Sequence, residues 1–169
     1  MTDVTTYFLE MKSASWLKDN TEARGLAIVE CEHKQFQFNR FLYQLVGSDW
    51  RWTDKNGWTD AQWQAFAEND NLRTWVGYCK GSPAGYFELQ QQRGGDVEIA
   101  YFGLAPRFIG QGFGGYLLAR AIKSAWAWEG TRRVWVHTCT LDHPRALPNY
   151  QARGFVVYKV ETTTHLDNG

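Results

Sequence analysis

The sequence predicts a single mixed α+β domain, with a central, mostly antiparallel twisted sheet flanked by helices. Its length of 169 residues fits one domain and is too short for two full ones. A composition of 44% hydrophobic and 21% charged residues is typical of a folded globular chain. Strand and helix patterns alternate along the chain, and no repeat, low-complexity tract or Pro/Gly/Ser-rich linker interrupts them.

The first part of the chain predicts a polar segment followed by one strand and two helices. Apolar side chains spaced by three and four residues before Gly47 indicate a helix that ends near this glycine. The next helix has Thr59 or Asp60 as its N-cap. We expect an N-terminal extension at 1–24, then a domain at 25–169 that opens with a strand at 25–32 and helices at 38–46 and 60–69.

The later part of the chain predicts most of the sheet. Two β-rich runs flank Lys80-Gly81-Ser82-Pro83, which is typical of a hairpin turn. A long helix follows a glycine-rich segment, and a shorter helix separates the last two strands. The expected order is strands at 74–79, 84–89 and 96–104, a helix at 112–128, a strand at 132–140, a helix at 143–153 and a strand at 155–162.

Charge and composition exclude several classes of protein. Eighteen basic residues balance eighteen acidic ones, and a net charge of zero argues against binding nucleic acid through a bulk positive field. No apolar run is long enough to span a bilayer, and the N-terminus lacks the pattern of a signal peptide. The three cysteines are far apart and suit reduced thiols. We therefore expect a cytoplasmic protein without nucleic-acid or membrane partners.

The segment Gly110-Gln111-Gly112-Phe113-Gly114-Gly115 follows a predicted strand and precedes a predicted helix. Glycine allows positive φ angles and lets a ligand approach the backbone amides, and the N-terminus of a helix attracts phosphate oxygens. A tight structural turn is the alternative. The spacing also matches the dinucleotide-binding fingerprint, but an antiparallel meander precedes it and no acidic residue ends the next strand. A Walker P-loop is excluded because no lysine follows Gly115.

Two motifs resemble those of the Gcn5-related N-acetyltransferases (GNAT). Residues Phe102–Leu118, within about 97–128, resemble the family's acetyl-CoA motif, in which a strand, an Arg/Gln-x-x-Gly-x-Gly/Ala loop and a Leu-rich helix follow one another. Residues His143–Phe155, within about 132–158, are similar to its second signature, Asn-x-x-Ala followed by Tyr and Gly-Phe. The resemblance implies a GNAT-like fold whose sheet is splayed at the acetyl-CoA strand. It also implies that residues 25–169 are a single N-acetyltransferase domain that uses acetyl-CoA.

The resemblance implies roles for two catalytic residues. Tyr150 would donate a proton to the departing CoA thiolate. Glu98 would accept a proton from the amine, and it shares one strand face with Ala100 and Phe102 by the period of two. The acetyl-CoA contacts that the resemblance implies are Phe102, Gly103, Leu104, Ile109, Gly110, Gln111, Gly112, Phe113, Gly114, Gly115 and His143.

The chain departs from the family pattern at two of these positions. With the loop aligned through Pro106 and Leu117-Leu118, Ile109 stands where the family has Arg or Gln, whereas a frame shifted by two residues puts Arg107 there but fits the following helix less well. Contact with the pyrophosphate is expected from backbone amides. His143 stands where Asn is usual, and its imidazole is a hydrogen-bond donor of different geometry.

The acceptor is expected to be an amine on a small molecule or a peptide. The family builds this pocket largely from the first two helices and their loop, where the present chain interleaves aromatic residues with carboxylates. That composition suits a cationic amine through cation–π contacts and charge pairing, and packing at the end of the sheet is the alternative. The residues concerned are Tyr43, Trp50, Trp52, Trp58, Trp63, Asp49, Asp54 and Asp60.

Four further interpretations complete the functional hypothesis. His137 and Cys139 share a strand face, but no third residue orients them as a nucleophilic pair, so His137 is retained as an auxiliary base. No histidine or cysteine spacing resembles a metal site, and we expect no metal. A non-catalytic acyl-CoA-binding module is the alternative function, and the presence of Glu98 and Tyr150 favours the enzyme. The apolar last strand favours pairing of two copies in a homodimer.

Overall fold

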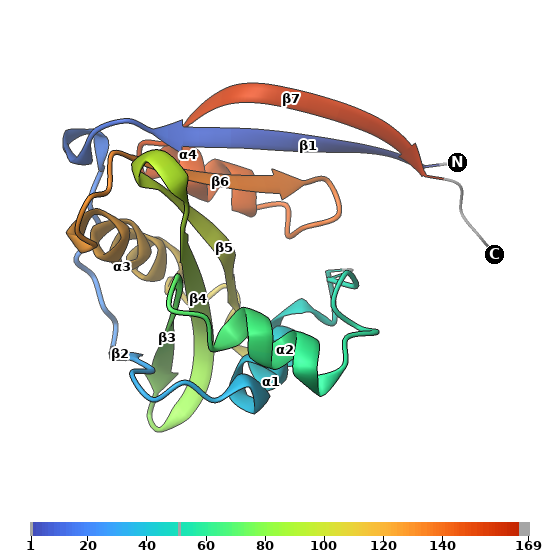
Figure 1. The fold of residues 1–169 in the computed structure, drawn as a ribbon. Helices are drawn as coiled ribbons and strands as arrows, with labels where there is room; N and C mark the ends of the chain where they lie inside the picture. Colours follow the sequence, from blue (N-terminus) through green and yellow to red (C-terminus); the bar gives the residue numbers. More distant parts are fainter. Residues whose placement is uncertain (1, 51, 166–169) are drawn as a thin grey trace.

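Within residues 2–50 and 52–165, which the computed structural model describes, seven strands form one sheet in the order β2-β3-β4-β5-β6-β1-β7 (Figure 1). Neighbouring strands are antiparallel except for β5 and β6. This confirms the predicted fold class. The strands are β1 (Thr2–Met11), β2 (Leu26–Glu30), β3 (Leu72–Cys79), β4 (Ser82–Gln91), β5 (Asp96–Leu104), β6 (Arg133–Cys139) and β7 (Val156–His165). The α-helices are α1 (Phe36–Gly47), α2 (Asp60–Ala67), α3 (Gly114–Ala127) and α4 (Ala146–Ala152).

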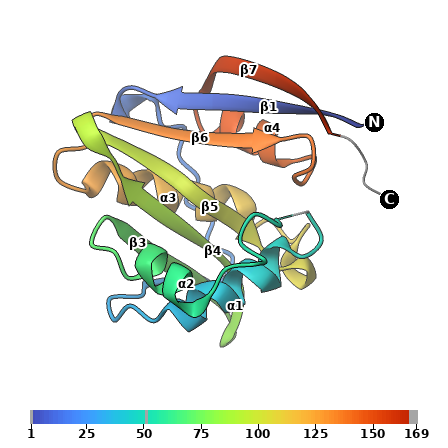
Figure 2. The same cartoon turned by 45° about the vertical axis from the view of Figure 1, so that its right-hand side comes forward.

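Helices cover both faces of the sheet (Figure 2). On one face α3 packs against β4, β5 and β6 with α4 beside it, and the apolar stripe of α3, including Leu118 and Ile122, is fully buried. On the other face α1 packs against β4 and β5 through Leu42 and Val46, and α2 lies against α1. No helix in this described part of the chain is long and apolar enough to cross a bilayer.

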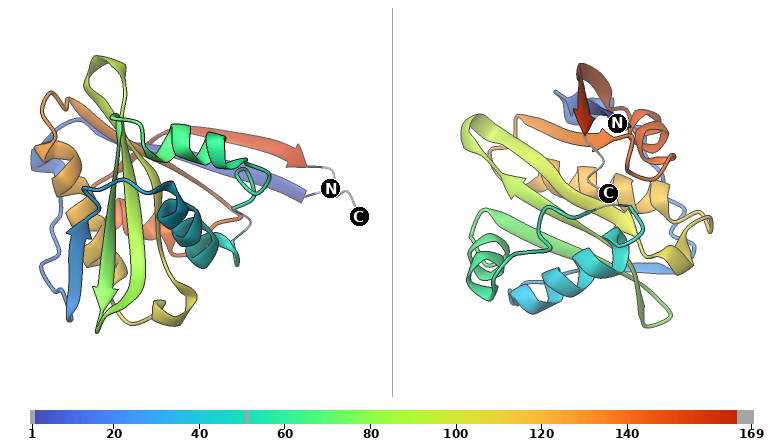
Figure 3. Two further views of the ribbon diagram at one scale, coloured as in Figure 1. Left: turned by 60° about the horizontal axis from the view of Figure 1, so that its bottom comes forward. Right: turned by 90° about the vertical axis from the view of Figure 1, so that its right-hand side faces the viewer.

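The N-terminal segment differs from its interpretation as an extension at 1–24. Residues Thr2–Met11 form β1, an interior strand that pairs with β6 on one side and β7 on the other. Leu9 and Met11 are fully buried in the core under α3. Both partner strands come from the C-terminal part of the chain, so no local hairpin pattern marks β1 in the sequence. Figure 3 shows β1 and β7 side by side, reaching past the other strands toward the two termini.

Strand β5 opens the sheet. It pairs with the parallel strand β6 only over Asp96–Glu98, and the two strands diverge beyond that point. A register shift against β4 leaves Ala100 as an extra residue, which is a β-bulge. The bulge turns Tyr101 toward the α1 face and Phe102 toward the α3 face. The prediction that Glu98, Ala100 and Phe102 share one face is therefore wrong.

Helix α4 is shorter than the helix predicted at 143–153. It begins at Ala146, so Pro144 precedes it and Pro148 is its third residue. The first four N–H groups of a helix have no partner within the helix, and a proline there removes no hydrogen bond. For this reason Pro148 does not break α4, and the next residue, Asn149, donates its N–H to the carbonyl of Arg145 at 3.0 Å.

Candidate active site

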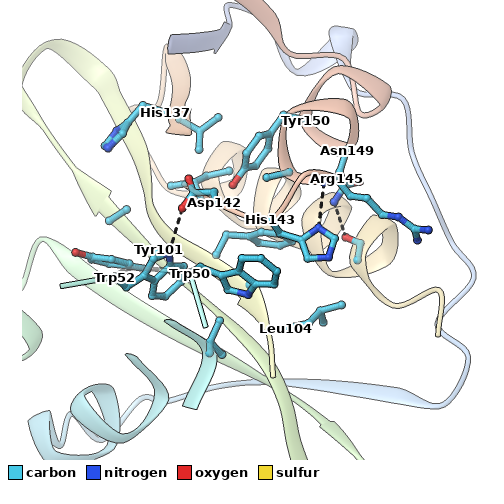
Figure 4. Close-up of a pocket in the computed structure, with 18 of the residues that line it drawn as sticks. Trp50, Trp52, Tyr101, Leu104, His137, Asp142, His143, Arg145, Asn149 and Tyr150 are labelled. Carbon is cyan, nitrogen blue, oxygen red and sulfur yellow. Dashed lines mark hydrogen bonds between the residues drawn. The ribbon is translucent and has the colours of Figure 1, made fainter. Parts of the chain in front are cut away.

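A cavity of about 950 Å³ opens where β5 and β6 diverge (Figure 4). Its walls come from the end of α1 and the loop that follows, from β5, from the glycine-rich loop before α3, from β6 and from α4. Both predicted catalytic residues, Glu98 and Tyr150, line this one cavity. The divergence of the two strands therefore creates the space in which the site is built.

One side of the cavity, the donor wall, consists largely of backbone. Gly110 and Gly112 have φ angles of +84° and +87°, a region that favours glycine. Gly103 sits where α1 comes close, because a Cβ there would lie 2.5 Å from Val46 Cγ1. The predicted cofactor contacts that line this wall are Phe102, Gly103, Leu104, Ile109, Gly110, Gly112, Gly114 and Gly115.

Two residues of the glycine-rich loop that were predicted to contact acetyl-CoA have side chains that lie away from the cavity wall. The side chain of Phe113 is buried in the core, with its ring 6.3 Å from that of Phe108. Gln111 is exposed, and its Nε2 donates a hydrogen bond to the carbonyl of Arg107 at 3.0 Å. Neither side chain lines the cavity. Both hold the loop in shape instead.

Positive charge near the donor wall comes from outside the glycine-rich loop. Ile109 lines the wall without a charge, whereas Arg145, which caps the start of α4, lines the cavity. Arg24, just before β2, lies behind the loop, and its Nε would be 2.7 Å from a Cβ added to Gly112. The sequence analysis selected neither arginine, and it assigned Arg24 to the N-terminal extension. No short-range pattern connects Arg24 with a loop almost ninety residues later.

Tyr150 lies on α4 and is 5% exposed, with its ring between those of Phe102 and Phe155 at 6.1 and 6.0 Å. Burial raises the pKa of Tyr150 above its ordinary value, and the negative charge of Asp142 adds to this. The phenol is therefore protonated at neutral pH and available as a donor. The Nδ2 of Asn149 donates to the carbonyl of Gly114 at 3.2 Å, which fixes α4 against the start of α3.

Asp142 joins the two sides of the cavity, and the sequence analysis missed this role. Its Oδ2 accepts hydrogen bonds from Thr138 Oγ1 at 2.7 Å and from the Cys139 N–H at 3.0 Å. Its Oδ1 accepts from Trp52 Nε1 at 3.3 Å (Figure 4). The end of β6 is thereby tied to the loop after α1. An acidic residue after a strand was the only signal in the sequence, because the contact with Trp52 depends on the tertiary fold.

His143 lies next to Asp142 in the loop before α4 and lines the cavity. Its Nδ1 accepts a hydrogen bond from the N–H of Arg145 at 3.0 Å. Its ring meets that of Trp50 edge to face at 4.8 Å. The imidazole therefore lies at the boundary between the donor wall and the aromatic residues on the opposite side.

Glu98 and His137 face each other across the two diverging strands. His137 Nδ1 is 3.5 Å from Glu98 Oε2, and the other oxygen of Glu98 accepts from Gln92 Nε2 at 3.0 Å. Gln92 is itself held by Trp135, whose Nε1 donates to its Oε1 at 2.9 Å. The hydrogen bond to Glu98 raises the pKa of His137, although burial alone would lower it. A carboxylate and an imidazole thus line the cavity together as candidate proton acceptors.

Cys139 also lines the cavity but lacks the environment of a nucleophile. Burial raises the pKa of its thiol, which disfavours the thiolate. All three cysteines of the chain are free thiols. Within the described ranges 2–50 and 52–165, no three His, Cys, Asp or Glu side chains cluster as ligands for a metal ion.

On the opposite side of the cavity, the acceptor wall, some of the predicted acceptor residues line the cavity and others pack in the core. Tyr43 and Trp63 are each 2% exposed and belong to the core, as the packing alternative predicts. Asp49 and Asp60 do not line the cavity, and Asp60 instead pairs with Arg40 at 2.6 Å. The acceptor wall itself comprises Trp50, Trp52, Asp54, Lys55, Phe66 and Tyr101. Three of these six residues were not selected from the sequence as acceptor residues: Lys55, Phe66 and Tyr101.

Comparison with known proteins points to one family. The model of the Acetyltransferase (GNAT) family matches residues 39–155. No curated protein matches the sequence.

Several solved structures share the fold. A GCN5-related N-acetyltransferase from Kribbella flavida has a TM-score of 0.68 at 16% identity, over 94% of this chain and 56% of that chain. An aminoglycoside acetyltransferase from an uncultured soil metagenomic sample has a TM-score of 0.63 at 15% identity, over 78% and 89% of the two chains. An IAA acetyltransferase from Bacillus cereus has a TM-score of 0.58 at 21% identity, over 79% of each chain. The present chain thus spans little more than half of the Kribbella protein.

Proposed function

The chain belongs to the GNAT acetyltransferase family, and from this premise we propose that it transfers an acetyl group from acetyl-CoA directly to a primary amine in a ternary complex. The observation that carries the proposal is the single cavity that contains the open end of β5, the glycine-rich loop, Glu98 and Tyr150. We assign the transferase domain to the whole described chain, because β1 is an interior strand of its sheet.

The donor wall suits acetyl-CoA on structural grounds. Beyond Glu98, the side of β5 that faces β6 has no paired strand, so its backbone can bind the amides of a pantetheine arm in the manner of a strand. The amides of the loop at 109–115, next to the start of α3, suit the pyrophosphate. Arg145 supplies a charge that Ile109 does not. His143 lies within reach of the same arm as a hydrogen-bonding group.

The catalytic residues divide the proton transfers between them. Acetyl-CoA supplies the acetyl group as a thioester, whose C–S bond breaks as the nitrogen of the amine bonds to the carbonyl carbon. Glu98 takes the proton that the amine must lose, directly or through water, and His137 assists it. Tyr150 donates its proton to the departing sulfur, because its raised pKa keeps it protonated.

A small cationic amine is the acceptor class that the acceptor wall favours. Aromatic rings with Asp54 at their edge attract a cation. One structural neighbour is named an aminoglycoside acetyltransferase, which fits the same chemical class. The three free thiols suit a reducing compartment, and we propose a cytoplasmic location.

A second copy of the chain is the partner that β7 favours. β7 lies at the edge of the sheet, and Val156, Tyr158 and Val160 are 54%, 43% and 53% exposed. Apolar side chains on an open edge favour strand pairing between copies. Light scattering should give the mass of a dimer for the wild type and of a monomer for Val160→Lys, whereas a wild-type monomer would contradict this part of the proposal.

Mass spectrometry tests the transferase proposal. Incubation with acetyl-CoA and a panel of diamines, aminoglycosides and peptides should give an acetylated amine and an equal amount of free CoA. Release of CoA without an acetylated amine would indicate hydrolysis and contradict the proposal. Binding of acetyl-CoA with no product from any amine would favour the non-catalytic module instead.

A further inference from the structure

The ammonium group of Lys55 lies inside a cage of aromatic rings. Its Nζ is 4.2 Å from the ring centre of Trp58, 4.5 Å from that of Phe66 and 4.8 Å from that of Tyr101. The side chain of Lys55 is only 8% exposed, which is unusual for a lysine. Three aromatic faces around one cation are the arrangement that proteins use to recognise alkylammonium groups.

The cage is held in place by its own contacts. Trp58 meets Phe66 edge to face at 5.6 Å, and Phe66 meets Tyr101 at 6.5 Å. The Tyr101 hydroxyl donates to Asp54 Oδ2 at 2.7 Å, and the Tyr43 hydroxyl donates to Asp54 Oδ1 at 3.1 Å. These rings come from α1, α2, β5 and the loop between the helices, so their arrangement does not depend on Lys55 alone.

Negative charge completes the cage. Asp54 Oδ2 lies 3.5 Å from Lys55 Nζ. Burial alone would raise the pKa of Asp54, but the hydrogen bond from Tyr101 and the charge of Lys55 hold it below its ordinary value. Behind the cage, the buried carboxyl of Glu88 feels the charge of Lys55, which partly offsets the rise in its pKa. The carboxylate of Asp54 therefore gives the edge of the cage a negative charge, which the hydrogen bond from Tyr101 stabilises together with Lys55.

Lys55 is a poor fit to this site as a hydrogen-bonding group. An ammonium carries three N–H donors. Within the described residues, its polar partner is the single carboxylate at 3.5 Å, a long distance for a charge-assisted hydrogen bond. Ring faces surround the rest of the group. A site of this kind recognises charge and shape rather than N–H donors, and a methylated or alkyl ammonium suits it at least as well.

The cage also opens into the proposed active site. Asp54, Lys55, Phe66 and Tyr101 line the same cavity as Glu98 and Tyr150. Tyr101 follows Glu98 by three residues on β5, and the bulge at Ala100 turns it toward the cage. A ligand that fills the cage can therefore extend along β5 toward the residues that would transfer the protons.

We propose that Trp58, Phe66, Tyr101 and Asp54 bind a cationic group of the acceptor, and that Lys55 is an internal occupant which the acceptor displaces. The acceptor class is then a small molecule with a second ammonium group besides the reacting amine, such as an α,ω-diamine or a polyamine. This inference rests on the proposed acetyl transfer for the identity of the ligand, but the cage itself is testable without acetyl-CoA.

The first test measures binding of tetramethylammonium by NMR titration in the absence of acetyl-CoA. In Lys55→Ala the cage loses its occupant, because the short side chain cannot reach the rings, and the dissociation constant should fall by about tenfold or more, the gain from vacating a site that is mostly filled. Adding Trp58→Leu to this variant should remove the gain. Circular dichroism and thermal unfolding establish that the variants are folded.

Lys159→Ala is the matched control. The Nζ of Lys159 also lies 4.8 Å from an aromatic ring centre, that of Phe8, but its side chain is 52% exposed and does not line the cavity. This variant loses one charge and one cation–π contact without opening a cage. Its affinity for tetramethylammonium should equal that of the wild type. Equal affinities of Lys55→Ala and Lys159→Ala would overturn the proposal.

A second measurement uses the wild-type chain and does not depend on any variant. Displacement of Lys55 exposes its amine, so tetramethylammonium should raise the rate at which an amine-specific acylating reagent labels Lys55, as quantified by peptide mass spectrometry. Sodium chloride at the same ionic strength should leave the rate unchanged. A labelling rate that is the same in both salts would contradict displacement.

Diamine selectivity separates this inference from the proposed function. With α,ω-diamines and amino alcohols of matched length as acceptors, the diamines should have the higher kcat/KM, and Trp58→Leu should remove their advantage. Equal kcat/KM for both series would overturn the acceptor assignment while leaving acetyl transfer intact. Binding of tetramethylammonium without acetylation of any amine would instead contradict the transferase and leave the cage.

Discussion

The two sides of the cavity present different parts of the chain: one presents backbone groups and the other presents side chains. The donor wall is mostly backbone, with glycines at 103, 110, 112, 114 and 115 that bring main-chain groups to the surface. The acceptor wall is mostly side chain, with aromatic rings packed edge to face or tilted against one another and a buried lysine among them. Backbone groups are the same in every chain, whereas packed side chains are specific to one.

This difference predicts which kinetic constant a change on each wall should alter. A wall of amides can bind the same donor throughout a family, and it requires little beyond glycine spacing and a helix N-terminus. A wall of rings has to fit one acceptor. Changes on the donor wall should therefore alter the KM for acetyl-CoA, and changes on the acceptor wall should alter the KM for the amine. Changes at Tyr150 and Glu98, where the walls meet, should alter kcat.

The largest expected effect is at the junction of the walls. Tyr150→Phe removes the proton donor and keeps the ring, and kcat should fall by about 10³-fold, within the usual range for general acid catalysis. Steady-state kinetics measure this change, and the KM for acetyl-CoA should stay close to the wild-type value. A kcat that is unchanged at every pH would exclude the acid role.

Glu98→Gln should have the next largest effect, about 10²-fold on kcat, because the proton of the amine loses its acceptor. The pKa of His137, which Glu98 raises, should move down toward its ordinary value in this variant. NMR titration of the imidazole checks the pairing, and the pH profile of kcat checks the catalytic role. If the pKa of His137 falls and kcat does not, Glu98 positions His137 but is not the base.

Glu88 lies under the acceptor wall and should make the protein less stable as pH rises. Its side chain is 1% exposed, and burial raises its pKa to about 7 from an ordinary value of 4.5. The carboxylate is thus penalised in the folded state only: the cost is absent below about pH 4.5, grows up to about pH 7 and is then constant. Glu88→Gln should remove this loss and stabilise the protein by about 1 to 3 kcal/mol at pH 8.

Urea unfolding at pH 5 and pH 8 measures the change at Glu88. Asn39, whose Nδ2 donates to Glu88 at 2.9 Å, keeps an acceptor in the glutamine variant. The matched control is Glu32→Gln, because Glu32 is exposed and should show no such difference. The same pH dependence in the wild type and in Glu88→Gln would contradict the assignment.

The smallest expected effect comes from a substitution that tests the donor wall alone. Gly110 and Gly81 have φ angles of +84° and +86°, and a Cβ on either would meet no atom within 4 Å. Alanine should therefore cost each site about 1 kcal/mol of backbone strain. Only Gly110→Ala should also raise the KM for acetyl-CoA, by about tenfold, since its methyl group would separate the amides from the ligand. Equal KM values for the two variants would exclude the loop from acetyl-CoA binding.

The sequence predicted the donor wall better than the acceptor wall for a physical reason. Loop glycines, the helix that follows and Tyr150 lie within one continuous stretch, so their spacing carries the information. The four glycines of the segment line the cavity, whereas the side chains of Gln111 and Phe113 do not, and Phe113 shows the limit of reasoning from spacing. Its ring enters the core, a direction that spacing alone does not determine.

Elsewhere the prediction failed where partners are distant in sequence. β1 is an interior strand only because β6 and β7 lie on its two sides, and the bulge at Ala100 arises from pairing with β4. Trp52 contacts Asp142 across ninety residues. The rings near α1 and α2 were recognised as a group, but only the tertiary fold separates Tyr43 and Trp63, which pack, from Trp50 and Trp52, which line the cavity.

Thermal unfolding with acetyl-CoA, CoA or NAD added tests the central claim, that this cavity holds acetyl-CoA. A ligand at about 100 times its Kd stabilises a protein by about 2.7 kcal/mol. For a chain of this size the Tm should rise by about 5 to 10 °C. The account predicts that rise with acetyl-CoA and with CoA but not with NAD. A rise with NAD alone, or no rise with any of the three, would contradict it.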